Sequence, residues 1–179
     1  MFKIYLIEDY VTLKVSEYIN DSNKILLEKL ANKYIDRIIF GTGLCILLDD
    51  NLLKCEPRIL PSEGQAHYKT HFRLLVFSPN INQILKGQII DCDSESITLS
   101  LGFFSDIRVI TSTLPPEYRY DKNAKCWSKI TDSSRKIYRL NDIVDFRVVD
   151  IIYNRTPEQT GNTTAKQLPV MLVIAALTD

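Results

Sequence analysis

The pattern of hydrophobic and polar positions in the first half of the chain predicts strands more often than helices. Residues Met1 to Val15 are rich in Ile, Leu, Val and Tyr, which favours a strand. Residues 68–76 alternate large even-numbered side chains with mainly polar odd-numbered ones, the period of two of a half-buried strand. Residues Ile38 to Leu48 carry no charge and contain Gly41 and Gly43, which predicts a buried strand with a bulge or a close backbone approach.

One helical period interrupts this pattern. Asn20, Asp21 and Ser22 offer side-chain oxygens that can cap a helix, and large apolar residues follow at helical spacing as far as Ile38. Charged residues occupy the other positions, which is the arrangement of an amphipathic helix. We therefore predict one helix over roughly residues 23–35.

The second half of the chain predicts strands without a helix of comparable length. Pro79 cannot donate a hydrogen bond within a sheet, so we expect a domain boundary near it. Five candidate strands follow, at Ile84–Cys92, Ser96–Gly102, Asp106–Ile110, Ile143–Val149 and Val170–Leu177. Five strands that close on themselves are typical of the oligonucleotide/oligosaccharide-binding (OB) barrel. Residues Asn154–Gln167 include no large hydrophobic side chain, so we expect a mobile loop there.

These patterns predict an α+β chain of two domains. Residues 1–79 should form a small domain with a helix on an antiparallel sheet, and residues 80–179 an all-β, five-stranded OB-fold barrel. The exposed side of the helix and the apolar strand Gly43–Leu48 offer more apolar surface than a domain of about 79 residues buries alone. We therefore expect a partner to cover part of the first domain.

Composition and charge narrow the classes of function. The chain of 179 residues is 45% hydrophobic and 25% charged, as is usual for a globular protein, and its 22 basic residues equal its 22 acidic ones. Attraction to nucleic acid therefore has to come from a local patch. We expect no secretion, because Glu8 and Asp9 interrupt the apolar start, and no membrane span, because the longest apolar stretches are too short.

No metal site, cofactor or enzyme activity is expected. The four cysteines are Cys45, Cys55, Cys92 and Cys126. They stand far apart without histidines at metal-ligand spacing, so they should be reduced and mostly buried thiols. His67 and His71 are four residues apart on a predicted strand that lacks the glutamate of a zinc-protease motif. No catalytic triad, phosphate-binding loop or paired-carboxylate motif can be assembled from the sequence.

A local positive patch lies between Glu117 and Arg139, with seven basic residues and three acidic ones. The basic residues are Arg119, Lys122, Lys125, Lys129, Arg135, Lys136 and Arg139, and the rings among them are Tyr118, Tyr120, Trp127 and Tyr138. Cations can bind phosphates while rings stack on bases, which suits weak, sequence-tolerant binding of single-stranded RNA. The alternative is a solvated loop whose Trp127 caps the barrel core and whose cations keep it soluble.

Further candidates for RNA binding lie on the predicted barrel. Lys86, Arg108 and Arg147 fall on strands, where a charged side chain faces solvent or a ligand rather than the interior. Phe103 and Phe104 adjoin a strand of the binding face in this type of barrel, and we expect at least one of them to pack in the core.

Short motifs in a fixed order connect the chain to a known family. In the first half they are Leu30-Ala31-Asn32-Lys33, Gly43-Leu44-Cys45-Ile46, His71-Phe72-Arg73 and Val76-Phe77-x-Pro79. In the second half they are Leu99-Ser100-Leu101-Gly102-Phe103-Phe104-x-Asp106-Ile107 and Phe146-Arg147-Val148-Val149-Asp150. In these motifs the chain resembles the larger stalk subunit of nuclear DNA-directed RNA polymerases and its archaeal relatives. The second-half motifs resemble the RNA polymerase III form in particular.

This resemblance implies a non-catalytic subunit of RNA polymerase III that works in the nucleus. The first domain would be the tip domain, which docks to the polymerase core and to a smaller helical stalk subunit through Leu44, Ile46 and Phe72. The two stalk subunits would support contact with initiation factors, and the barrel would bind nascent single-stranded RNA. The RNA-binding residues would be Lys86, Phe103, Phe104, Arg108, Arg119, Lys125, Trp127, Lys129 and Arg147.

Two other interpretations stay open. One is the equivalent stalk subunit of another nuclear RNA polymerase. The other is a free-standing OB-fold RNA-binding protein whose first half serves as a private interaction module.

Overall fold

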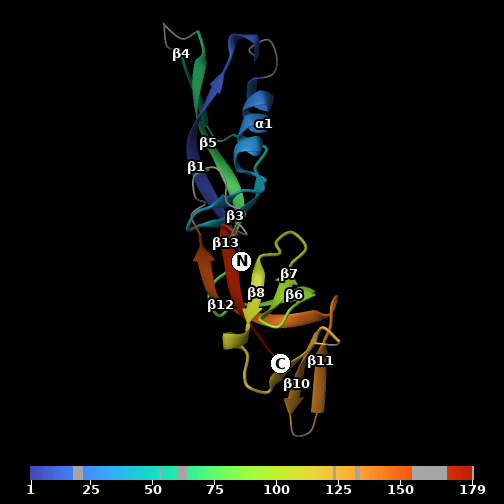
Figure 1. The fold of residues 1–179 in the computed structure, drawn as a ribbon. Coiled ribbons are helices and arrows are strands. Elements are labelled where there is room, and N and C mark those ends of the chain that lie inside the picture. The colour runs from blue at the N-terminus through green and yellow to red at the C-terminus, as the bar shows by residue number, and fades with distance from the viewer. Residues whose placement is uncertain are drawn as a thin grey trace. The chain divides into compact units, whose positions relative to one another are not determined.

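The computed structural model describes residues 1–17, 22–52, 54–59, 64–122, 124–131, 134–154 and 169–178. The chain divides into two compact units, Met1–Ser78 and Pro79–Asp179, whose elements are labelled in Figure 1. Most described residues lie in strands, and the described α-helix belongs to the first unit. Two short 3-10 turns span Val15–Glu17 and Thr111–Thr113. None of the described helices is both long and apolar enough to cross a bilayer.

The first unit is an antiparallel sheet that carries one helix. Its elements are β1 (Phe2–Leu13), α1 (Ser22–Tyr34), β2 (Ile38–Ile39), β3 (Gly43–Leu48), β4 (Lys54–Ile59) and β5 (Ala66–Phe77). β5 is the central strand, because β1 pairs along one of its edges while β3 and β4 pair along the other. β2 pairs with β3 at the margin of the sheet. The helix predicted over roughly residues 23–35 and the strand predicted over residues 68–76 are both present, as α1 and β5.

The core of the first unit lies between α1 and one face of the sheet. The helix buries Leu26 and Leu30, and β5 contributes Phe72, which is fully buried. The even-numbered residues of β5 from Thr70 to Val76 are all buried, which confirms the predicted period of two. The opposite face of the sheet is not covered by α1. The odd-numbered apolar residues of β1 join the core, and the even-numbered residues face away from it.

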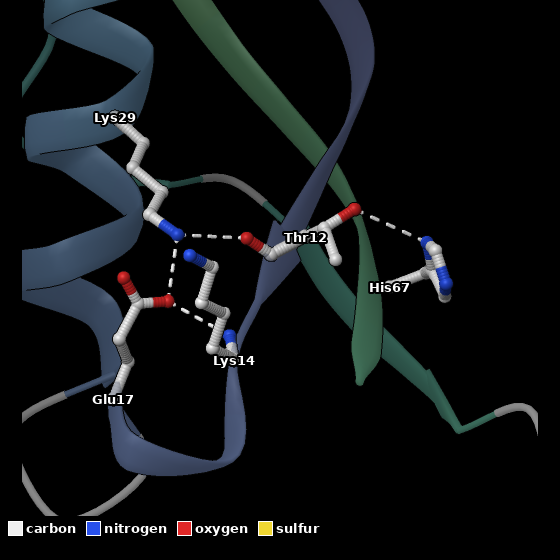
Figure 2. A network of polar contacts seen from close by, with 5 residues as sticks. All are labelled: Thr12, Lys14, Glu17, Lys29 and His67. Carbon is white, nitrogen blue, oxygen red and sulfur yellow. Dashed lines mark hydrogen bonds and ion pairs between the residues drawn. The ribbon is translucent and has the colours of Figure 1, made fainter. Parts of the chain in front are cut away.

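Polar contacts tie α1 to the end of β1, as Figure 2 shows. The Lys29 ammonium donates hydrogen bonds to the Thr12 carbonyl oxygen at 2.8 Å and to the Glu17 carboxylate at 2.7 Å. The same carboxylate oxygen accepts the Lys14 backbone N–H at 2.8 Å. The hydrogen bond from Lys29, helped by the one from Lys14, holds the pKa of Glu17 below its usual value. On β5, the His67 ring lies 3.2 Å from the Thr12 hydroxyl, so the network joins the helix to two strands.

The prediction of a single strand over residues 38–48 is wrong in one respect. The segment forms two strands, β2 and β3, joined by a turn in which the Thr42 N–H donates to the Ile39 carbonyl oxygen at 3.0 Å. Gly41 has a φ of 72° in this turn, a left-handed conformation that costs other residues free energy. The glycine therefore turns what reads as one apolar strand into a hairpin.

Gly43 brings β3 against β5. It has a φ of 141°, and a Cβ added to it would collide with the Phe77 carbonyl oxygen. The strand register also shifts between Cys45 and Leu47, which is a β-bulge. The close backbone approach and the bulge expected for this segment are both confirmed.

The second unit contains a closed barrel of five strands. They are β6 (Ile84–Cys92), β7 (Ser96–Ser100), β8 (Ile107–Ile110), β12 (Ile143–Tyr153) and β13 (Met171–Leu177). Around the barrel they follow the order β12-β13-β8-β7-β6, and β6 closes on β12. Neighbouring strands are antiparallel except β13 and β8, which are parallel. All five predicted strands are present, and the closed barrel is consistent with the expected OB-fold.

Between β8 and β12 the chain forms a second sheet. Its strands are β9 (Tyr118–Asp121), β10 (Cys126–Thr131) and β11 (Ser134–Tyr138), in the antiparallel order β11-β10-β9. The alternative of a solvated loop over these residues is therefore wrong as to secondary structure, whereas the position that it gave Trp127, against the barrel, is confirmed. The loop predicted at Asn154–Gln167 lies, apart from Asn154, outside the described residues.

We predict that Gly43→Ala lowers the free energy of unfolding of the first unit by roughly 3 kcal/mol, because β3 would have to move away from β5. Gly41→Ala is the matched control: nothing lies within 4 Å of its added Cβ, so only the left-handed backbone cost applies. That cost is about 1 kcal/mol. Denaturant unfolding followed by circular dichroism measures both changes, and equal losses would contradict a role for the close approach.

Candidate nucleic-acid and partner interfaces

The rings of the positive patch gather on one face of the β9–β11 sheet, which we call the ring face (Tyr118, Tyr120, Trp127 and Tyr138). On β10, Trp127 lies opposite Tyr120 of β9 and Tyr138 of β11. Two residues further along β10, Lys129 lies opposite Tyr118. Residues that lie opposite each other in a sheet point to the same side, so these side chains share a face.

The ring face is buried and holds the sheet against the barrel. Trp127 is only 3% exposed, and its indole N–H donates a hydrogen bond to the Asp93 carbonyl oxygen at 2.9 Å, in the turn between β6 and β7. The Tyr118 and Tyr138 rings stack with centroids 5.7 Å apart. Burial and the hydrogen bond with the Tyr118 hydroxyl raise the pKa of Tyr138 to about 12. The rings therefore serve as an anchor, and Trp127 is not open to stacking on a base.

The cations of the patch are divided between the two faces of the sheet. The Lys129 ammonium lies 5.7 Å from the centroid of the Tyr118 ring, and the Lys136 ammonium lies 5.3 Å from that of the Tyr138 ring. These are cation–π contacts on the ring face. Arg119, by contrast, lies opposite Ser128 of β10 and therefore points to the other side. The patch is continuous in sequence but not on the surface.

The barrel candidates also fall into two groups. Lys86 on β6 and Arg147 on β12 are exposed on neighbouring strands, and the Lys86 ammonium lies 4.0 Å from the Asp145 carboxylate. Arg108 lies on β8 and is half-buried. In the connection between β7 and β8, Phe103 is 44% exposed whereas Phe104 is buried. One of the two phenylalanines thus packs in the interior, as expected.

The residues predicted to contact a partner are mostly buried. Phe72 is fully buried in its core, Leu44 is buried, and Ile46 is half-buried. Phe72 therefore supports the sheet from within, and a direct contact through it would need the core to open. Leu44 lies opposite Phe77, which lies opposite Phe2, so Leu44 belongs to the sheet face that α1 leaves uncovered, although it is only 8% exposed there. Their contact role stays a prediction.

Exposed apolar residues instead occupy the sheet face that α1 leaves uncovered, which we call the outer apolar face (Phe2, Ile4, Leu6 and Leu47). Ile4 is 70% exposed and lies opposite Leu75 of β5, which in turn lies opposite Leu47 of β3. The three side chains form a row across three strands. A signal for this face is present in the sequence, because β1 carries large apolar residues at both even and odd positions, as strands covered on both faces do.

The cysteines and histidines form no metal site within the described residues. All four cysteines are free thiols, and Cys45, Cys92 and Cys126 are buried, as the sequence predicts. Burial raises the pKa of Cys92 to about 11, which keeps its thiol protonated and unreactive at neutral pH.

Comparison with known proteins relates the chain to polymerase subunits. The family model described as RNA polymerase III subunit Rpc25 matches residues 83–173. DNA-directed RNA polymerase III subunit RPC8 of Bos taurus is 30% identical over 170 residues, which cover 93% of this chain and 83% of that protein. Subunit RPC8 of Saccharomyces cerevisiae is 31% identical over 83% of this chain and 71% of its own length. DNA-directed RNA polymerase II subunit RPB7 of the same yeast is 32% identical, but over only 35% of this chain and 37% of its own length.

We predict that Trp127→Phe loosens the β9–β11 sheet by about 1–2 kcal/mol, because the ring stays buried while the Asp93 carbonyl oxygen loses its donor. Hydrogen exchange of the β10 amides measures the change, and roughly tenfold faster exchange is expected. Tyr120→Phe is the matched control, since it removes a longer hydrogen bond, 3.4 Å, from the Tyr120 hydroxyl to the Cys92 carbonyl oxygen. If the two variants exchange alike, the indole bond is not what holds the sheet.

Proposed function

Because this chain belongs to the family of RNA polymerase III subunit Rpc25, we propose that it is a non-catalytic stalk subunit of RNA polymerase III that works in the nucleus. The observation that carries the proposal is the extent of the similarity to RPC8, which runs through both units rather than through the barrel alone. The much shorter match to the RNA polymerase II subunit favours polymerase III over its polymerase II counterpart. A free-standing RNA-binding protein would not need a first unit of this family.

The first unit docks to the polymerase core and to a smaller helical stalk subunit in this proposal. The outer apolar face supports it, because a row of large exposed apolar side chains on a sheet is costly in water unless another surface covers it. An amphipathic helix can bury such a face, with its own apolar stripe toward the sheet. The contact with initiation factors would then involve the pair of subunits.

The barrel binds single-stranded RNA in this proposal. In OB-folds the second and third strands form the usual binding face, and these correspond to β7 and β8. Arg108 on β8 supplies a positive charge for a phosphate, and Phe103, in the connection between these strands, exposes a ring for a base. Lys86 on β6 and Arg147 on β12 supply two further cations, along which the bound RNA can continue.

We predict that affinity purification of the chain followed by mass spectrometry recovers the other subunits of RNA polymerase III. Ile4→Ser with Leu6→Ser should reduce recovery of the smaller stalk subunit by at least about tenfold, since each buried apolar side chain contributes about 1.5–3 kcal/mol. Ile143→Ser, at an exposed isoleucine of the barrel, is the matched control and should leave recovery unchanged. Purification without any polymerase subunit would refute the subunit role.

We predict that Phe103→Ala weakens binding of oligouridine by roughly 5- to 150-fold, which corresponds to about 1–3 kcal/mol of lost stacking. Arg108→Gln should lower the slope of log affinity against log salt by about 1, because one phosphate contact is lost. Lys24→Gln, at an exposed lysine of α1, is the control for charge and should change neither quantity. The same measurement on Lys86→Gln with Arg147→Gln tests the cations on β6 and β12. If every barrel variant keeps the wild-type affinity and salt dependence, RNA binding by the barrel is ruled out.

A further inference from the structure

The β9–β11 sheet turns a second face away from its rings, which we call the cationic face. Strand register assigns residues to it: Arg119 on β9 lies opposite Ser128, and Arg135 on β11 lies opposite Ile130. Ser128 and Ile130 alternate with Trp127 along β10, so they point to the side opposite the ring face. Their cross-strand partners Arg119 and Arg135 point to the same side.

Four positive charges gather on the cationic face. Arg119 and Arg135 are joined by Lys125 and Arg139, which line one shallow, open hollow together with Arg135. All four side chains are exposed, and among the described residues none of them forms an ion pair with an acidic side chain. Asp121 is the acidic residue that lines the hollow. The face thus has excess positive charge in a chain whose net charge is zero.

Exposed aliphatic side chains lie among these charges. Ile130 is 44% exposed, Ile137 is 37% exposed and Leu140 is 51% exposed. Ile137 and Leu140 line the same hollow as the cations. An apolar surface rimmed by charges of one sign is typical of a protein contact, because both kinds of side chain can be satisfied by one complementary surface.

The edge of the sheet is also open to an extended chain. Among the described strands, β11 pairs only with β10, so its other edge has main-chain N–H and C=O groups that no strand of this sheet uses. Addition of a peptide as a further strand to such an edge is a common mode of recognition. A peptide bound there would run beside Arg135 and Ile137.

The chemistry of the cationic face favours a peptide over RNA. Tolerant binding of single-stranded RNA depends on rings that stack on bases. The rings of this sheet lie on the other face, where Tyr118, Trp127 and Tyr138 are buried and Tyr120 is half-buried. Phosphates would pair with the arginines but would leave the aliphatic side chains in water. Carboxylates pair with arginine equally well, and apolar side chains beside them would cover the isoleucines and the leucine.

We infer that the cationic face binds an extended segment of a partner protein in which acidic residues are interspersed with large apolar ones. This inference goes beyond the proposed function and does not depend on it, because neither polymerase assembly nor RNA binding by the barrel is needed for such a contact. Arg119 and Lys125, which the sequence suggested for RNA, serve the acidic segment instead.

The test titrates the full chain into labelled probes and follows fluorescence anisotropy. The first probe is a peptide of repeated Glu-Glu-Leu-Leu, roughly twelve residues long, which presents both residue types on each side when extended. The second has Ser in place of Leu, and the third is oligouridine of matched charge. We expect the first to bind at least about tenfold more tightly than the second. Oligouridine binding should be unaffected by Arg135→Glu with Arg139→Glu, because the face does not take up RNA.

Variants of the cationic face distinguish the contribution of its positive charges from that of its aliphatic side chains. Arg135→Glu with Arg139→Glu should lower the affinity for the first peptide by at least about tenfold, whereas Lys24→Glu on α1 should not change this affinity. Ile137→Ser should lower the affinity for the first peptide and leave the affinity for the serine peptide unchanged. A peptide with Lys in place of Glu should bind the doubly reversed variant but not the original chain, which shows that the variant is folded.

Four results would overturn the inference. Oligouridine binding that is tighter than that of the first peptide, weakened by Arg135→Glu with Arg139→Glu and indifferent to Ile137→Ser would make the face an RNA surface. Equal affinity for the leucine and serine peptides would reduce it to nonspecific ion pairing. Absence of binding by every probe, or failure of the lysine peptide to bind the reversed variant, would leave the face without a docking role.

Discussion

The pairing register of the strands is the constraint on which the surfaces of this chain depend. Side chains alternate across a strand, so a slip of one residue in β10 would move Trp127 into solvent and bring Ser128 and Ile130 to the barrel side. The indole hydrogen bond to the Asp93 carbonyl oxygen and the stacked Tyr118 and Tyr138 rings oppose such a slip. The same register separates the rings from most of the arginines, and so determines which ligands each face can bind.

The regular elements could be predicted because burial on one side leaves a period in the sequence. β5 alternates between core and outside, and α1 presents apolar residues at helical spacing, so both were predicted close to their observed ends. β4 could not be predicted, since Glu56, Pro57 and Arg58 read against a strand. Proline is tolerated there because, among the described strands, β4 pairs with β5 alone and needs no donor on its other side.

The β9–β11 sheet escaped prediction for a different reason. One side carries tyrosines and a tryptophan together with Lys129 and Lys136, and the other side mixes exposed isoleucine and arginine with the buried Cys126 and Ser128. Neither side gives a clean alternation of apolar and polar residues. The exposure of Trp127 was undecidable for a related reason: it depends on an acceptor at Asp93, far away in the sequence, that only the folded barrel brings within reach. The candidate RNA residues are therefore predicted by residue type alone, and which of them share a surface depends on strand pairing that the sequence does not show.

The parallel pair of β8 and β13 links the closing of the barrel to the strand that is synthesised after the other four. The first unit has all of its described strands once Phe77 has left the ribosome, so it can fold while the rest is still being translated. In the second unit β13 stands between β8 and β12, and until Met171–Leu177 emerges both of these strands have an unsatisfied edge. Nascent barrels are thus open to association with one another during synthesis, and a chaperone that shields strand edges would act on this half of the molecule.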